Sequence, residues 1–108
     1  MHLHGAHTKP QFDGYPEDWY TSNQRKNFAV FTYKNNQEPA ALWYHDHAVG
    51  NTRLNVYAGL AGVYNIRDDV EDALNLPSGD YEIPLVIQDR SFSEDGSLFY
   101  PSVSPIPT

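Results

Sequence analysis

The chain has 108 residues, which is enough for one small domain with one hydrophobic core. Apolar residues make up 40% and charged residues 19%, a globular composition that excludes a disordered or fibrous chain. The formal net charge of −7 argues against nucleic acid and anionic membranes as partners, because both bind basic surfaces. The negative charge instead favours cations as ligands.

Two absences narrow the chemistry further. The chain has no cysteine, which excludes disulfides, thiolate zinc sites, a catalytic thiol and a cysteine-ligated blue copper within these residues. Met1 runs directly into His2, without the basic start and apolar stretch of a secretion signal, and no apolar run approaches membrane-spanning length. We therefore expect a soluble product, whose cellular location stays open.

The first part of the chain predicts a loop followed by a strand. Glycines and prolines punctuate residues 1–24, and the aromatic side chains among them predict a packed loop. Residues 28–33 alternate between two faces and are rich in β-forming residues, which predicts a strand. Residues 35–39 then form a turn.

The middle of the chain predicts two further strands and two short helices. Residues 40–47 predict a buried strand and residues 61–66 another, with a helical turn over 52–60 between them. Residues 69–74 predict a short helix with acidic residues at its start, and residues 83–88 a later strand. Several short strands separated by turns indicate a mainly β fold, an antiparallel sandwich or barrel with one or two short helices.

The end of the chain has a different character. Periodicity is lost from Ser91 onward, and Pro101, Pro105 and Pro107 are typical of an extended linker or tail. We therefore expect residues 1–90 to form the domain and residues 91–108 to form a Pro-rich tail.

Two His-X-His pairs, His2-Leu3-His4 and His45-Asp46-His47, are the candidates for metal chemistry. In a strand, residues i and i+2 point to the same face, so each pair can reach one metal or two neighbouring metals. Neutral imidazole suits copper, zinc, iron and nickel, so the spacing alone does not choose among them. Alternation directs the Asp46 side chain away from the pair, which favours a structural hydrogen bond for it.

The residues around these pairs resemble the first cupredoxin domain of bacterial multicopper oxidases, of the spore-coat laccase and bilirubin oxidase type. The similarity spans nearly the whole chain, from His2 to about Pro101. The segments that carry it are His2-Leu3-His4-Gly5, Asp13-Gly14-Tyr15-Pro16, Leu42-Trp43-Tyr44-His45-Asp46-His47, the run from Arg53 to Gly62, and Ile87-Gln88-Asp89-Arg90. The resemblance implies a partial cupredoxin-like Greek-key fold, because the family's first domain has several strands before its first copper motif.

The resemblance also implies a cofactor and a reaction. In the family, these motifs supply half of a trinuclear copper cluster that reduces dioxygen to water, with electrons from phenols or bilirubin-type substrates. Carried over by motif, His2 would be a type 2 copper ligand, and His4, His45 and His47 would be type 3 ligands. His7 matches no ligand position and is expected at the surface.

Asp13 is the candidate catalytic residue. It resembles the acidic residue that lies near the route of oxygen and protons in this family, where a carboxylate could relay protons. The alternative is that Asp13 serves only as a turn-former, since Asp-Gly favours tight turns on local grounds. Trp43 and Tyr44 are expected to pack in the core beside the site.

The chain departs from the family in holding only one set of ligands. In the family, the last domain supplies the other histidines and the blue copper that takes electrons from the substrate. We therefore expect oxidase activity of the isolated chain to be slow or absent. Missing strands would leave sheet edges open, which favours self-association into a homo-oligomer by strand pairing or exchange, with two copies bringing eight histidines together.

Two other functions stay open at this point. One is a non-catalytic metal-binding or assembly fragment, which shares every motif with the oxidase. The other is a mononuclear metalloenzyme, such as a cupin-like oxygenase or a zinc hydrolase, which uses three ligands and leaves one position open. The glutamate that cupins usually carry after His-X-His is absent from residues 48–51.

Overall fold

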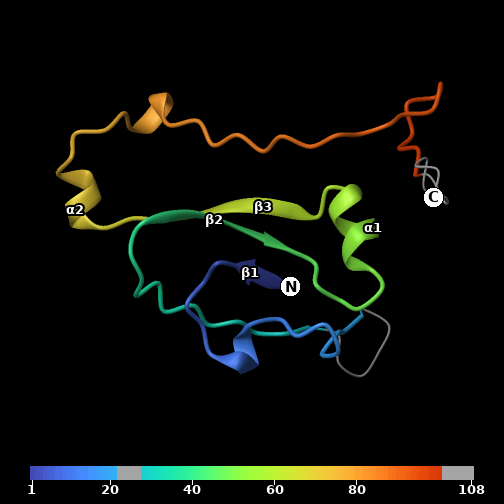
Figure 1. Ribbon diagram of the computed structural model, residues 1–108, viewed down its shortest axis with the longest axis horizontal. Helices are drawn as coiled ribbons and strands as arrows, with labels where there is room; N and C mark the ends of the chain where they lie inside the picture. The colour runs from blue at the N-terminus through green and yellow to red at the C-terminus, as the bar shows by residue number, and fades with distance from the viewer. Residues whose placement is uncertain (22–27, 101–108) are drawn as a thin grey trace, which may run out of the picture.

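The computed structural model describes residues 1–21 and 28–100, so the predicted tail beyond Tyr100 lies outside the described residues. One antiparallel sheet, in the order β1-β2-β3, is built from β1 (His2–His4), β2 (Ala40–His45) and β3 (Ala61–Ile66) (Figure 1). The helical elements are α1 (Thr52–Tyr57), α2 (Asp69–Asp72) and the 3-10 turns η1 (Pro10–Phe12) and η2 (Gly79–Tyr81). This confirms a mainly β chain with short helices.

The register of β1 on β2 decides which side chains share a face. His2 pairs with His45, Leu3 with Tyr44, and His4 with Trp43. Directly paired residues of antiparallel strands point to the same side of a sheet, and successive residues alternate. His2, His4, Trp43 and His45 therefore share one side, which we call the histidine face.

The opposite face carries the small hydrophobic core. Leu3 and Ile66, at 2% and 6% exposed, are the buried apolar side chains among residues 1–21 and 28–100. Tyr44 lies across Gly62 so closely that a Cβ at Gly62 would stand 2.4 Å from the Tyr44 hydroxyl oxygen. Tyr64 meets the ring of Tyr33 edge-on, with 6.1 Å between ring centroids. The residue between the first two histidines is thus anchored in the core.

Helix α1 connects the end of β2 to β3 and is closed by a glycine. Gly59 has a φ of +99°, and its N–H donates to Val56 O at 3.0 Å while Leu60 N donates to Asn55 O at 2.9 Å. This pair of bonds is the Schellman arrangement, which ends a helix and satisfies its last carbonyls. The chain then turns directly into β3 at Ala61.

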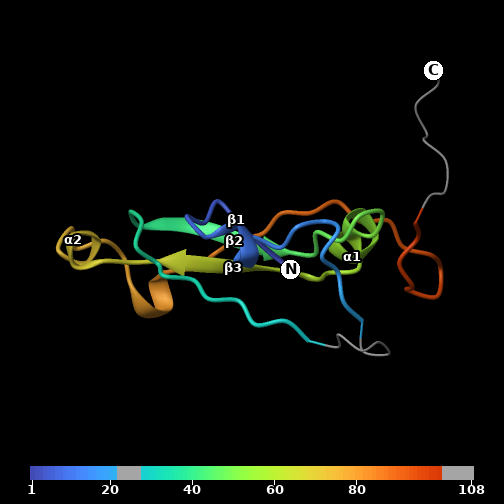
Figure 2. The same cartoon turned by 90° about the horizontal axis from the view of Figure 1, so that it is seen from below.

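The two helices lie at opposite ends of the sheet (Figures 1 and 2). At the start of α2, the Asp68 side chain accepts from Glu71 N at 2.8 Å and caps the helix, a contact that the sequence analysis did not predict. No helix in the described part of the chain is long and apolar enough to cross a bilayer.

Two predicted strands are wrong. Residues 28–33 and 83–88 belong to no strand, although both segments have the composition of one. A strand requires a hydrogen-bonded neighbour, and residues 84–87 instead share a cavity of about 370 Å³ with β2 and β3. Pro84 has no N–H to donate, and Leu85 and Ile87 are 79% and 95% exposed. This segment therefore leaves apolar side chains uncovered.

The predicted burial of residues 40–47 is also wrong, except at His45, which is 6% exposed. Strand β2 forms, but Trp43 and Tyr44 are each 39% exposed, so they are not core residues. In the N-terminal segment that was predicted to be a packed loop, Tyr15 and Trp19 are 56% and 48% exposed. That loop is therefore only partly packed. Among the described residues, nothing covers these aromatic surfaces fully.

Residues 91–99 form a small hairpin that the loss of periodicity did not predict. Phe92 and Leu98 form an isolated antiparallel bridge, and Ser93 N donates to Ser97 O at 2.9 Å. The hairpin is fastened to α1 by the Tyr57 hydroxyl, which lies 3.0 Å from Ser91 N and 2.5 Å from Phe99 O. This hairpin therefore packs against the end of helix α1.

Candidate metal centre

The pairing of β1 with β2 brings the two histidine pairs together. His2 lies at the centre of the group, with its ring centroid 5.5 Å from His4, 5.4 Å from His45 and 4.8 Å from His47. One ring nitrogen from each of His2, His4 and His45 lies within 4.8 Å of the other two. The four candidate ligands are therefore one cluster, as the family resemblance implies.

Backbone carbonyls orient three of the four rings. His2 Nδ1 lies 2.6 Å from Asp13 O, His45 Nδ1 2.7 Å from Asp46 O, and His47 Nδ1 3.1 Å from Gly14 O. A carbonyl oxygen only accepts hydrogen bonds, so each Nδ1 carries the proton. In the neutral form of each ring the unprotonated nitrogen is then Nε2, and the neutral imidazole is the form that ligates a metal.

His4 uses its other nitrogen. Its Nδ1 lies within hydrogen-bond distance of His45 Nε2, at 3.3 Å, so the two nitrogens face each other. Two nitrogens held about 2.0 Å from one ion at a tetrahedral angle lie about 3.3 Å apart. The spacing of this pair therefore matches two ligands of one transition-metal ion.

His45 is the buried member of the cluster, at 6% exposed. Burial lowers the pKa of His45 from its ordinary value of 6.5, and the neighbouring His2, His4 and His47 lower it further against the raising effect of the Asp46 hydrogen bond. The neutral imidazole is thus favoured, which suits metal binding.

Trp43 stacks on the cluster. Its ring lies 4.2 Å from the ring of His45 at an interplanar angle of 27°, and 5.3 Å from the ring of His4 at 24°. The strand alternation that places the histidines on one face places Trp43 there too, a signal available in the sequence. Its contact with the ligands, rather than with the core, is what the sequence interpretation missed.

The two aspartates differ in position. Asp46 Oδ1 accepts from Ala48 N at 3.0 Å, which confirms a structural hydrogen bond for this residue. Asp13 lies beside the cluster, with Oδ1 3.4 Å from His2 Nδ1 and its side chain 43% exposed. Its catalytic role stays a prediction. His7 is exposed, and the structure gives it a backbone contact with Gln37, which agrees with a surface position.

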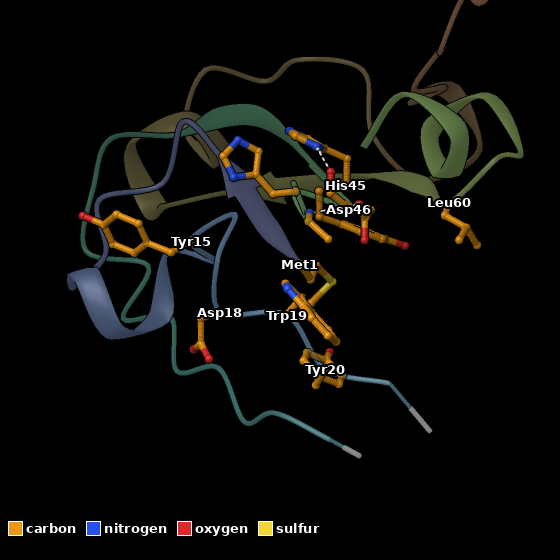
Figure 3. Close-up of a pocket in the computed structure, with 11 residues that line it drawn as sticks. Met1, Tyr15, Asp18, Trp19, Tyr20, His45, Asp46 and Leu60 are labelled. Atoms are coloured by element: carbon orange, nitrogen blue, oxygen red, sulfur yellow. Dashed lines mark hydrogen bonds between the residues drawn. The ribbon is translucent and has the colours of Figure 1, made fainter. Parts of the chain in front are cut away.

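Two hollows flank the cluster. A cavity of about 270 Å³ is lined by His45 and His47 and by aromatic side chains. Figure 3 shows Met1, Trp19 and Tyr20 gathered beneath His45. A wider hollow of about 580 Å³ opens over the histidine face and is lined on its far side by Arg53, Tyr57, Asp89 and Arg90. Sequence reasoning did not connect these last four residues to the site, because the link runs through tertiary packing.

A cluster of four imidazoles, three of them on one antiparallel sheet, has the composition of a histidine-rich metal site. The comparisons identify it more closely: residues 1–71 match the multicopper oxidase family, and the chain belongs to that family. It is 52% identical to a laccase of Bacillus stratosphericus over 94% of its length and 50% identical to a laccase of Bacillus subtilis over 100%. It is also 42% identical to the multicopper oxidase LPR1 of Arabidopsis thaliana over 97%.

The chain spans only about a fifth of these relatives, since the matches cover 21%, 22% and 20% of their lengths. Copper is the cofactor that membership of this family implies. The donor set fits copper, because imidazole nitrogens are good ligands for this metal and those of His4 and His45 already converge. Together with the family match, the three-stranded sheet is a partial cupredoxin-like fold.

Proposed function

We propose that the chain contributes half of the copper cluster of a laccase-like oxidase, with His2, His4, His45 and His47 as the ligands. The observation that carries this proposal is the 3.3 Å approach of His4 Nδ1 to His45 Nε2, which joins the two distant pairs. The identity of about half of all residues with two laccases supports the reaction class. The parent reaction would oxidise phenols or bilirubin-type substrates and reduce dioxygen to water.

Bound copper would cycle between two oxidation states and so supply the electron transfer to dioxygen. The chain's own residues would hold that metal in place. His2, His45 and His47 offer Nε2 because backbone carbonyls occupy Nδ1, and His4 offers Nδ1. By the family resemblance, His2 would serve the type 2 copper and the other three histidines the type 3 coppers.

Asp13 would carry protons in this reaction. Its carboxylate is part-exposed and lies 3.4 Å from the His2 ring, so it can take a proton from solvent and release it beside the cluster. The backbone carbonyl of the same residue orients His2. Asp13 thus combines a positioning contact with a candidate proton transfer.

The isolated chain would oxidise substrates slowly or not at all. Its 108 residues contain no cysteine and so cannot hold the blue copper that accepts electrons in laccases. Electrons would have to enter directly at the histidine face, which is open to solvent through the hollow of about 580 Å³. A non-catalytic metal-binding role is therefore the alternative function.

The experiment measures copper retained after desalting and the oxidation of a phenolic dye, for wild type, His45→Ala and His7→Ala. We expect wild type and His7→Ala to retain equal copper and His45→Ala to lose it, because His7 lies outside the cluster. Equal retention by all three proteins would remove the copper-site proposal. If the copper is retained as expected but dye oxidation is equal in wild type and His45→Ala, the oxidation does not come from the histidine-bound copper and the non-catalytic role stands.

We further propose that two copies associate through the surfaces that the sheet leaves open. Trp43 on the histidine face is 39% exposed, and Leu85 and Ile87 in the unpaired segment beside β2 and β3 are 79% and 95% exposed. Apolar side chains at this exposure favour burial against a partner. An isologous contact would bring the histidine pairs of both copies together.

A further inference from the structure

Gly14 packs against the start of β1 more closely than any side chain allows. Its φ is +76°, and a Cβ at this position would stand 1.8 Å from the carbonyl oxygen of Met1 and 3.1 Å from the Cα of His2. A contact of 1.8 Å is a steric overlap with backbone, which cannot swing away as a side chain can. Residue 14 must therefore be glycine for the loop to lie where it does.

Because of this close approach, one loop forms a hydrogen bond with one histidine of each pair. Asp13 O accepts from His2 Nδ1 at 2.6 Å, and the next carbonyl, Gly14 O, accepts from His47 Nδ1 at 3.1 Å. Two residues further on, Pro16 O accepts from Val49 N at 3.0 Å. Consecutive carbonyls thus bridge a ligand at the N-terminus to a ligand that lies beyond the end of β2.

Of these two carbonyl contacts, the one from Gly14 positions His47, which the pairing of β1 with β2 does not reach. The β1–β2 ladder pairs His2 with His45 and ends there, so it does not place His47. Ring stacking brings His2 and His47 within 4.8 Å, but stacking does not choose which nitrogen faces the metal. The two carbonyls make that choice, because each one requires an Nδ1–H donor.

We propose that Gly14 is a positioning residue of the metal centre: the absence of a side chain lets the Asp13–Gly14 carbonyls hold His2 and His47 with Nε2 toward the metal. The identity of that metal as copper rests on the proposed function. The positioning itself is a property of the metal-free chain, so it can be tested separately.

Gly50 provides a matched control. It has the same φ of +76°, but a Cβ at Gly50 would meet nothing within 4 Å. Gly14→Ala and Gly50→Ala therefore impose the same positive φ on alanine, and only Gly14→Ala adds the overlap with Met1. The difference between the two variants isolates the position of the loop.

The experiment titrates each protein with Cu²⁺ by calorimetry and records the imidazole ¹⁵N spectra of the metal-free proteins. We expect Gly14→Ala to bind Cu²⁺ about 10- to 100-fold more weakly than Gly50→Ala, the usual effect of losing the partners that orient a ligand. We also expect the Nδ1–H signals of His2 and His47 to change in Gly14→Ala and to persist in Gly50→Ala. Equal affinities and unchanged tautomers in both variants would overturn the proposal.

A measurement on the wild type keeps the proposal testable even if Gly14→Ala does not fold. The metal-free wild-type chain should show His2 and His47 as Nδ1–H tautomers, with hydrogen-bond couplings to the labelled carbonyl carbons of Asp13 and Gly14. Nε2–H tautomers at both residues would overturn the proposal. Failure of the wild type to bind Cu²⁺ would instead count against the proposed function and leave the positioning result intact.

Discussion

The Nδ1 atom of His4 and the Nε2 atom of His45 lie 3.3 Å apart, although 41 positions separate these residues in the chain. They are diagonal neighbours across the β1–β2 ladder, since His45 pairs with His2 and His4 pairs with Trp43. A slip of this register by one residue would send one pair to the opposite face. The convergence of His4 and His45 therefore depends on the register of β1 on β2.

Removing one member of the converging pair should abolish tight metal binding. We expect His4→Ala to lower the affinity for Cu²⁺ at least tenfold, because even the loss of a group that only orients a ligand costs about 10- to 100-fold. His7→Ala, which removes an exposed imidazole three residues away, should bind like the wild type. Calorimetric titration measures both, and equal losses in the two variants would contradict a site at His4.

The stability of the metal-free chain should fall at mildly acidic pH. Burial holds the pKa of His45 below 6.5, so between that lowered value and 6.5 the unfolded chain binds a proton that the folded chain does not. The free energy of unfolding therefore decreases as the pH falls below 6.5 and is insensitive to this group above it. Urea denaturation across this range checks the slope. His45→Gln, which cannot titrate, should show a flatter dependence, and an unchanged slope would contradict the assignment.

The hydroxyl of Tyr57 should secure the 91–99 hairpin. Tyr57→Phe removes the contacts to Ser91 N and Phe99 O but keeps the ring under Arg90, so we expect a loss of about 1–2 kcal/mol in the free energy of unfolding. The Ser91 amide should also exchange faster with solvent. Tyr81→Phe, at a side chain that is 83% exposed, is the control. Unchanged amide protection at Ser91 would rule out the fastening role.

The chain should self-associate in solution, and charges on the unpaired segment should weaken the contact. We expect light scattering coupled to size exclusion to give a mass above that of one 12.3 kDa chain, and Ile87→Lys to shift it toward the monomer. Ser78→Lys, which adds the same single positive charge at an exposed position outside the apolar segment, should leave the mass unchanged. A strict monomer for the wild type, with and without copper, would end the proposal.

Local patterns were sufficient to predict much of the site. The i, i+2 spacing of each pair places its side chains on one face of a strand, and the apolar runs at 40–47 and 61–66 do contain β2 and β3. The family resemblance then relates the pairs to each other. No local pattern specifies the partner of a strand, and for that reason residues 28–33 and 83–88 looked like strands and are not.

The groups that orient the ligands were the hardest to predict. Backbone carbonyls, such as those of Asp13 and Gly14, are present at every residue, so only their position in space distinguishes them. The Asp-Gly dipeptide signalled a turn, but its approach to Met1 depends on tertiary packing. In the same way, alternation could place Trp43 on the histidine face but could not show that its ring lies uncovered against His45.

The most deeply buried apolar residue of the described chain, Leu3, is flanked on both sides by candidate ligands. A metal that ties down His2 and His4 therefore also holds Leu3 in the core, so loading and folding are thermodynamically linked. The yield of intact chain in a cell should then follow copper supply. Copper starvation should leave more of the chain open to proteases, and copper feeding should rescue it without any change in transcription.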